Sequence, residues 1–164
     1  EEKISAIVVK HDQDEAFTVS DRIGVLAEGK LQQWDSPFEI YHHPQNRVVA
    51  NCVGEGKFLD GKLLGDGTIE TDLGVVRAPN FQGQTGDEVE VFVRPHELVP
   101  GNNGSSVNAE VIKKEFLGTT TLYTLKLTNG ALVESSFMVD HDYQVGDQLG
   151  LRLETSQLVA FRRV

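Results

Sequence analysis

The side chain best placed for chemistry is His11, which stands between a short apolar run and a helix-like pattern. Residues 4–9 are rich in β-branched side chains and too few to span a membrane, so they predict a buried strand. Asp12 or Asp14 can then cap a helix that continues through Val19. In an open α/β sheet, a catalytic side chain normally lies at the carboxyl end of a strand, beside a helix N-terminus that favours anions. His11 occupies that position, although a lone histidine there is more often an ordinary surface residue.

Two neighbouring patterns offer weaker candidates. Asp14 and Glu15 resemble an acid and base pair, but adjacent helix residues point about 100° apart and do not converge on one substrate. We expect them to supply favourable charge in the first helical turn. His42 and His43 precede Pro44 at a helix end with no third metal ligand nearby in the sequence, so we interpret them as cations at a helix C-terminus.

Residues 56–63 imitate a phosphate-binding loop. They fit the spacing G-x-x-x-x-G-K, but Leu63 stands where the loop needs a hydroxyl for magnesium. The segment also follows a helix-like pattern and lies in a strand-like region, whereas a phosphate loop follows a strand and opens a helix. We do not assign a nucleotide site to it.

The second half of the chain holds four further candidates in predicted loops. Arg94 and His96 lie at the end of a predicted strand, and Asp140 and His141 lie together in a loop with oxygen and nitrogen donors. They are regulatory-loop candidates for a small ligand, against the simpler interpretation that all four are solvated turn residues.

Composition excludes several classes of function. The chain has 164 residues, 39% of them hydrophobic, and 25 acidic against 15 basic residues give a net charge of -10. That charge would repel a nucleic-acid backbone, and the basic residues do not cluster. Cys52 is the one cysteine, so neither a disulfide framework nor a cysteine metal site is expected, and a reducing compartment fits best. The sequence has no membrane-length apolar run and no leader pattern.

The pattern of the chain changes near residue 53. Residues 1–53 predict a strand, a helix, a strand hairpin at residues 23–34 and two short helices, with Ser36 and Asn46 as caps and a capping box at Ser36. The face of the last helix should hold Val48, Val49, Cys52 and Val53. Residues 54–164 instead show short apolar alternations between glycine turns, typical of a small β-barrel or sandwich. The predicted strands are residues 57–64, 68–71, 74–77, 88–93, 107–116, 120–127, 132–137, 148–153 and 158–162.

Two details of this β half carry specific expectations. Gly118 should supply a bulge or a positive φ that lets a strand cross between barrels. The aromatic side chains should be packing residues rather than a stacking surface for nucleic acid, because a basic groove is missing. These are Phe58, Phe81, Phe92, Phe116, Tyr123, Phe137, Tyr143 and Phe161. We see no internal repeat.

The ordered motifs of the first fifty residues resemble the switch-histidine region of ABC-transporter ATP-binding subunits. They read H-D-Q-D-E-A at residues 11–16, S-D-R-I-G-V-L at 20–26, E-G-K-L at 28–31, S-P-F-E-I-Y at 36–41 and P-Q-N-R-V-V-A at 44–50. The β half resembles the TOBE regulatory domain of the same importers, a pair of entwined OB-like barrels. That resemblance rests on V-R-P-H-E at residues 93–97, E-F-L-G-T-T at 115–120, G-D at 146–147 and V-A-F at 159–161.

The resemblance implies a fold and a role. The fold class is mainly β: residues 54–164 would form a TOBE-like OB-fold domain, and residues 1–53 the α/β end of an ABC ATPase domain. His11 would contact the γ-phosphate of ATP and the attacking water. ATP and Mg2+ would be the cofactors of the complete subunit, but this segment lacks the P-loop lysine and the Walker B carboxylates, so it should not hydrolyse ATP alone. Residues 53–61 resemble the junction in ferric-iron importers more than that in sugar or sulfate importers.

Partners and location follow from the same resemblance. The partners would be membrane permease subunits, a periplasmic or lipoprotein solute-binding protein reached through the permease, and a second copy of the subunit. The location would be cytoplasmic, on the inner face of the membrane, without direct insertion. Unpaired strand edges at residues 4–9 and 23–27 also favour a dimer, with or without exchanged segments. The alternative is a free-standing ligand-binding module of the molybdate-binding kind, which would leave residues 1–53 unexplained.

Overall fold

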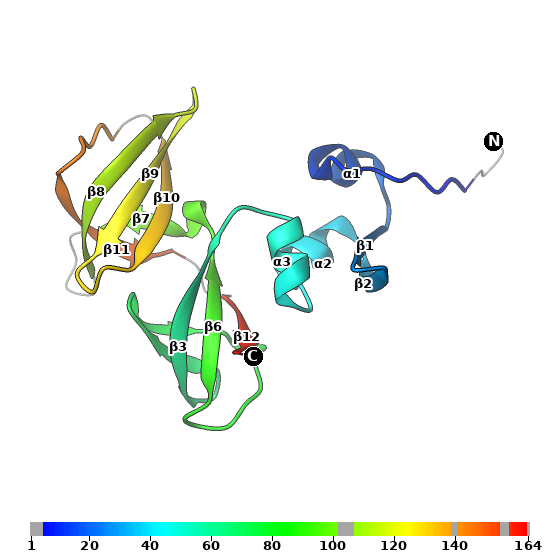
Figure 1. Cartoon of the computed structure of the whole chain (residues 1–164), viewed down its shortest axis with the longest axis horizontal. Helices are drawn as coiled ribbons and strands as arrows, with labels where there is room; N and C mark the ends of the chain where they lie inside the picture. The colour runs from blue at the N-terminus through cyan, green and yellow to red at the C-terminus, as the bar shows by residue number, and fades with distance from the viewer. Residues whose placement is uncertain (1–4, 102–106, 139–140, 155–157, 164) are drawn as a thin grey trace. The chain divides into compact units, whose positions relative to one another are not determined.

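The computed structural model describes residues 5–101, 107–138, 141–154 and 158–163. Its contacts divide the chain into two compact units, Glu1–Gly54 and Glu55–Val164. The first unit combines short helices with one hairpin, and the second is built from strands (Figure 1). The predicted mainly β class is confirmed.

The first unit packs its short elements around a small core. Val25, Ile40, Val49 and Val53 are buried together, and Phe17 packs against them. The elements are α1 (Gln13–Val19), β1 (Ile23–Ala27), β2 (Lys30–Asp35), α2 (Pro37–His42) and α3 (Arg47–Cys52). β1 and β2 pair in antiparallel fashion as a two-stranded sheet.

The predicted buried strand before His11 is wrong. Residues 5–10 have no regular secondary structure and are all exposed, and Ile7 is 94% exposed. A strand needs a neighbour for its backbone groups and its apolar faces, and no described strand pairs with this segment. Ile4 lies outside the described residues.

The predicted helix caps agree with the structure better than the predicted helix faces do. Asp12, Ser36 and Asn46 cap α1, α2 and α3 through side-chain oxygens. At α2 the capping box is incomplete, because the Glu39 carboxylate contacts His43 Nδ1 at 2.8 Å and the backbone N–H of Ser36 donates to Asp35.

The predicted face of α3 is partly wrong. Val49, Ala50 and Val53 are buried, whereas Val48 and Cys52 are exposed. The expected helical stripe is therefore rotated toward Ala50.

Two five-stranded sheets make up the second unit. Their orders are β12-β6-β3-β4-β5 and β10-β9-β8-β11-β7, with antiparallel pairing throughout. The strands are β3 (Lys57–Gly65), β4 (Thr68–Thr71), β5 (Gly74–Arg77), β6 (Glu88–Val93), β7 (Leu98–Pro100), β8 (Val107–Phe116), β9 (Thr120–Leu127), β10 (Leu132–Met138), β11 (Gln148–Leu153) and β12 (Val159–Arg162). β7 and the 3-10 turn η1 (Pro95–Glu97) were not predicted.

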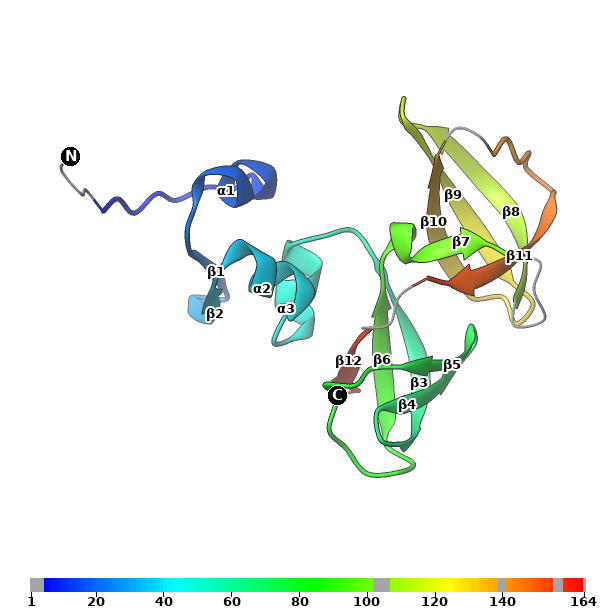
Figure 2. The same ribbon diagram turned by 180° about the vertical axis from the view of Figure 1, so that it is seen from behind.

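The two sheets exchange their fifth strands. β3 to β6 form four strands of the first sheet, and β8 to β11 form four strands of the second. β7, which follows β6, pairs with β11, and β12, which follows β11, pairs with β6 (Figure 2). Val91 of β6 faces Ala160 of β12, and Leu151 of β11 faces Pro100 of β7. Each sheet is therefore completed by the other half of the unit.

The β half contains an internal repeat, so the sequence-based prediction of none is wrong. Gln84-Thr85-Gly86-Asp87 precedes β6 as Gln144-Val145-Gly146-Asp147 precedes β11. In each turn the aspartate side chain accepts the backbone N–H of the glutamine, at 2.9 Å and 2.8 Å. Only a few residues recur along the chain, so the repeat is visible mainly in the backbone.

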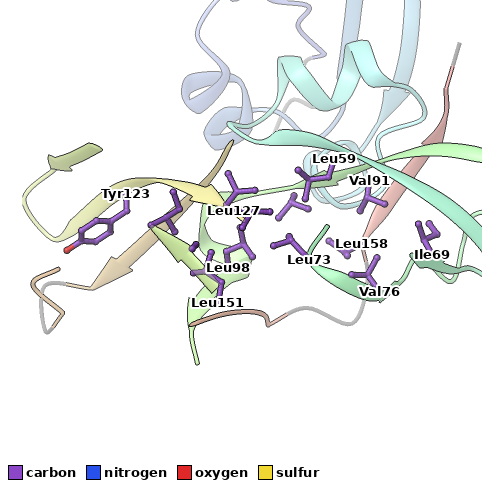
Figure 3. Close-up of a cluster of buried hydrophobic side chains, with 14 of the residues drawn as sticks. Leu59, Ile69, Leu73, Val76, Val91, Leu98, Tyr123, Leu127, Leu151 and Leu158 are labelled. Atoms are coloured by element: carbon purple, nitrogen blue, oxygen red, sulfur yellow. The ribbon is translucent and has the colours of Figure 1, made fainter. Parts of the chain in front are cut away.

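One hydrophobic core spans both sheets. Leu59, Leu73 and Ile69 belong to the first sheet or its turns, and Leu98 and Tyr123 belong to the second. Figure 3 shows these side chains in one continuous cluster. Most aromatic residues pack here or against one another as expected. Phe116 is the exception, because it is 68% exposed.

Gly118 does not carry a strand between barrels. It has the predicted positive φ, 93°, but it lies in the tight turn that joins β8 to β9. Leu117 N–H donates to Thr120 O at 2.9 Å across this turn. The crossings between the sheets occur instead after β6 and after β11.

Candidate functional site

His11 lies exposed immediately before the helix cap. Asp12 Oδ1 accepts the backbone N–H groups of Asp14 and Glu15 at 2.9 Å and 3.1 Å, which fixes where α1 begins. Lys10 Nζ contacts Glu15 Oε2 at 2.5 Å across the same bend. His11 itself is exposed to solvent, between the exposed residues 5–10 and the Asp12 cap.

A buried amide supports the rest of this unit. Gln33 is 4% exposed; its Nε2 donates to His43 O at 3.1 Å and its Oε1 accepts Gln45 N–H at 2.9 Å. These bonds hold the segment between α2 and α3 against β2. Sequence alternation gives no sign of this role, because nothing in the local pattern distinguishes Gln33 from the neighbouring Gln32.

Arg94 and His96 share one turn but not one environment. Arg94 is 4% exposed, and its guanidinium carbon lies 5.0 Å from the centre of the Phe92 ring. Glu97 Oε2 accepts the backbone N–H of Arg94 at 2.8 Å. His96 is exposed on η1. The structure thus buries one of the two regulatory-loop candidates and leaves the other facing solvent.

His141 lies against aromatic side chains of the second sheet and of the segment after β10. Its ring is 6.0 Å from both Phe137 and Tyr143, and nearly parallel to Tyr143. Its backbone oxygen accepts the hydroxyl of Tyr123 at 3.0 Å. Asp140, the remaining candidate, lies outside the described residues.

An ion pair fastens the segment after β10 to β8. The Lys114 ammonium contacts the Asp142 carboxylate. The hydrogen bond from Lys114 lowers the pKa of Asp142, and the hydrogen bond to Asp142 raises the pKa of Lys114. The segment that carries His141 is therefore anchored twice, through the side chain of Asp142 and through the backbone oxygen of His141.

Metal and membrane sites find little support in the described residues. Among them, no group of three or more histidine, cysteine, aspartate or glutamate side chains gathers as a metal would require. No helix in the described part of the chain is both long and apolar enough to cross a bilayer. Residues 57–63 of the imitation phosphate loop lie in β3.

Sequence reasoning missed Glu97, whose side chain is buried beside Arg94. A signal was available, because Glu97 lies three residues after Arg94 with Pro95 between them, which is the spacing of a helix start with its reciprocal cap. Ser135, whose hydroxyl donates to Leu98 O, left no such signal.

A protein-family model described as the TOBE domain covers the last part of the β unit. Residues 91–161 match this model. The TOBE match begins inside β6 and ends inside β12, so it includes the second repeat and both strand crossings.

Import ATP-binding proteins are among the relatives that match most of the chain. The spermidine/putrescine import ATP-binding protein PotA of Rubrobacter xylanophilus is 39% identical over 77% of the chain, and PotA 1 of Pseudomonas aeruginosa is 37% identical over 79%. The Fe(3+) ions import ATP-binding protein FbpC of Fusobacterium nucleatum is 30% identical over 96% of the chain. The chain spans only 36%, 37% and 44% of the length of these three relatives.

A solved structure shares the fold of the β unit. The cytoplasmic molybdate-binding protein ModG, in a molybdate-bound crystal form, superimposes with a TM-score of 0.55 at 15% identity. The match covers 65% of this chain and 96% of ModG.

Proposed function

We propose that this chain is the C-terminal part of the ATP-binding subunit of an ABC importer. Residues 1–53 would be the end of its ATPase domain, and residues 54–164 its regulatory and dimerising TOBE domain. The single observation that carries the proposal is the similarity to import ATP-binding proteins over 96% of the chain, both units included. The alternative, a free-standing module, would leave the similarity in the first unit without a role.

In this proposal His11 senses the γ-phosphate in the complete subunit. Its exposed position beside the Asp12 cap supports that role, because a neutral imidazole has one donor and one acceptor for a phosphate oxygen and a water. ATP and Mg2+ would be bound by residues outside this chain, so the chain by itself should not turn over ATP.

The test of this assignment uses the natural gene. We expect codons upstream of Glu1 to encode a P-loop and a Walker B pair, and the extended subunit to hydrolyse ATP. His11→Ala in that subunit should lower kcat by at least about a hundredfold, the usual size of a lost acid, base or charge contact. A natural start at Glu1 without an ATP site would refute the proposal.

The transported solute is a finer part of the proposal. Residues 53–61 favour ferric iron, whereas the spermidine/putrescine names of the relatives with 39% and 37% identity favour a polyamine over the 30% identical FbpC. Uptake assays with labelled spermidine and ferric ion in a strain lacking the gene decide between them. Loss of spermidine uptake alone would exclude the ferric assignment.

The proposed partners are the membrane permease subunits, a solute-binding protein outside the membrane, and a second copy of the subunit. The location would be the cytoplasmic face of the cell membrane. Self-association is supported by the exposed β-branched run at residues 5–10 and by the free edge of β1. Sedimentation at tens of micromolar should show a dimer, and a monomer would exclude it at that concentration.

A second candidate function is ligand binding by the β unit alone. It is favoured by the coverage of 96% of ModG, a molybdate-binding protein. Arg94, His96, Asp140 and His141 remain the proposed regulatory-loop residues for it. A thermal-shift screen with molybdate, ferric ion, spermidine and a sugar tests this function, because a ligand specific for the folded state raises the melting temperature.

A further inference from the structure

The turn after β6 is the place where the chain leaves one sheet for the other. β6 ends at Val93, η1 follows, and β7 pairs with β11 in the second sheet. The ladders and the shared core would be the same if β7 came from a second copy of the chain, as in a domain-swapped dimer. They therefore do not determine which copy supplies the strand. That choice depends on the connecting turn.

The turn is closed by a buried pair of opposite charges. The side chains of Arg94 and Glu97 are 5% and 10% exposed. Glu97 Oε2 accepts the backbone N–H of Arg94 at 2.8 Å, and Glu97 Oε1 lies 4.0 Å from Arg94 Nη1. The Arg94 guanidinium also lies over the ring of Phe92 in β6. Arg94 is thus held from the first sheet, and Glu97 contacts it from the other side of the turn.

The other contacts of this region belong to the second sheet. Glu97 O accepts the N–H of Glu154 at 2.8 Å, and Leu98 O accepts the hydroxyl of Ser135. These bonds would move with β7 if the turn opened and the strand joined another copy. The Arg94–Glu97 contact would be broken by the same opening, because Arg94 and Glu97 are on opposite sides of the turn.

We propose that the Arg94–Glu97 pair is a latch that keeps the exchange of β7 within one chain. A buried ion pair adds little net stability over an apolar pair of the same size, but it demands one geometry. Here that geometry is the closed turn. Within one chain the strand and its partner sheet have an effective concentration of about 1 mM. At protein concentrations near that value the two routes compete, and the latch decides between them. This inference is independent of the proposed transport function.

The test determines whether β7 pairs with β11 of its own chain or with β11 of a second copy. Val99 and Arg152 face each other in the β7–β11 ladder. Replacing both by cysteine in a Cys52→Ser chain allows a disulfide at ordinary cross-strand spacing. Oxidation links the chain to itself if the exchange is internal, and links two chains if β7 is shared. The protein is refolded at about 1 mM, the concentration at which the routes compete.

The latch is removed by Arg94→Met with Glu97→Met, which keeps side-chain bulk. We expect the disulfide-linked dimer to rise by at least about tenfold over the parent, because two methionine side chains no longer demand the closed turn. The matched control is Lys113→Met with Glu115→Met, because that pair is exposed on β8 and also neutral in sum. It should leave the parent pattern unchanged.

Three results would overturn the latch. They are an unchanged monomeric disulfide in the folded double variant, linked dimers already prominent in the parent, or an equal rise in the control. Circular dichroism checks that each variant is folded. If the double variant does not fold, Glu97→Gln carries the same comparison, because it retains the shape of the turn and loses the charge pair.

Discussion

Gln33 is a buried amide that satisfies two backbone groups at once. Replacing it by methionine leaves His43 O and Gln45 N–H without their bonds in a covered site. We expect Gln33→Met to lower the free energy of unfolding of the first unit by about 1–3 kcal/mol. The fluorescence of Trp34, the one tryptophan, follows this unit during urea unfolding.

The control for this residue is Gln45→Met, since the side chain of Gln45 is exposed. It should change the unfolding midpoint by little. A midpoint for Gln33→Met as high as that of the control would mean that the amide contributes nothing as a clamp.

The Lys114–Asp142 pair makes a pH-dependent contribution. The pKa of Asp142 is lowered, so its stabilising effect is present above the ordinary value of 3.8 and is lost as pH falls through the lowered pKa. The pKa of Lys114 is raised, so its effect is present below 10.5 and is lost as pH rises through the raised pKa. The full effect therefore lies between those two ordinary values.

We expect Asp142→Asn to lower the melting temperature at neutral pH and to have no effect in strong acid. Melting curves of the parent and the variant, recorded from about pH 2 to about pH 7, measure the difference in melting temperature. Glu115→Gln, in a neighbouring exposed pair, is the comparison. A difference between parent and Asp142→Asn that is constant with pH would refute the ion pair as its cause.

At the scale of elements, two glycines with positive φ separate backbone strain from a clash. Gly67 has φ 67°, and a Cβ there would lie 2.5 Å from Ala78 O. Gly118 has φ 93°, and a Cβ there would meet nothing within 4 Å. Gly118→Ala should therefore cost about 1–2 kcal/mol from backbone strain alone. Gly67→Ala should cost clearly more.

Guanidinium unfolding of the β unit, followed by circular dichroism, compares the two variants. Equal losses of unfolding free energy in the two variants would contradict a close approach between Gly67, in the turn before β4, and Ala78, which follows β5.

For the whole molecule, the exchanged strands make the two repeats depend on each other. Residues 55–101 produced alone would lack β12 beside β6, and their core would lose Leu158 and the second sheet. We expect that fragment to be unfolded, whereas residues 55–164 alone should fold. Amide proton dispersion in NMR spectra distinguishes the two states. A folded fragment of residues 55–101 would refute mutual completion.

Local features were within reach of the sequence. Caps at Asp12, Ser36 and Asn46, and nearly all strand positions in the β half, depend on neighbours within a few residues. Side-chain alternation and glycine turns carry that information directly. β7 was not predicted, because a strand of 3 residues that includes a proline is too short to show side-chain alternation.

The partners of these elements, by contrast, are known from the folded chain alone. The apolar run before His11 predicts a strand by composition, but strand formation needs a partner, and the described chain supplies none. The exchange of β7 and β12 likewise joins residues far apart in sequence. Local backbone preferences and side-chain patterns were enough to place the helix caps and most strands of the β half, but they predicted a strand before His11 that does not form and missed β7. Pairing and burial depend on contacts across the whole fold, which no local pattern encodes.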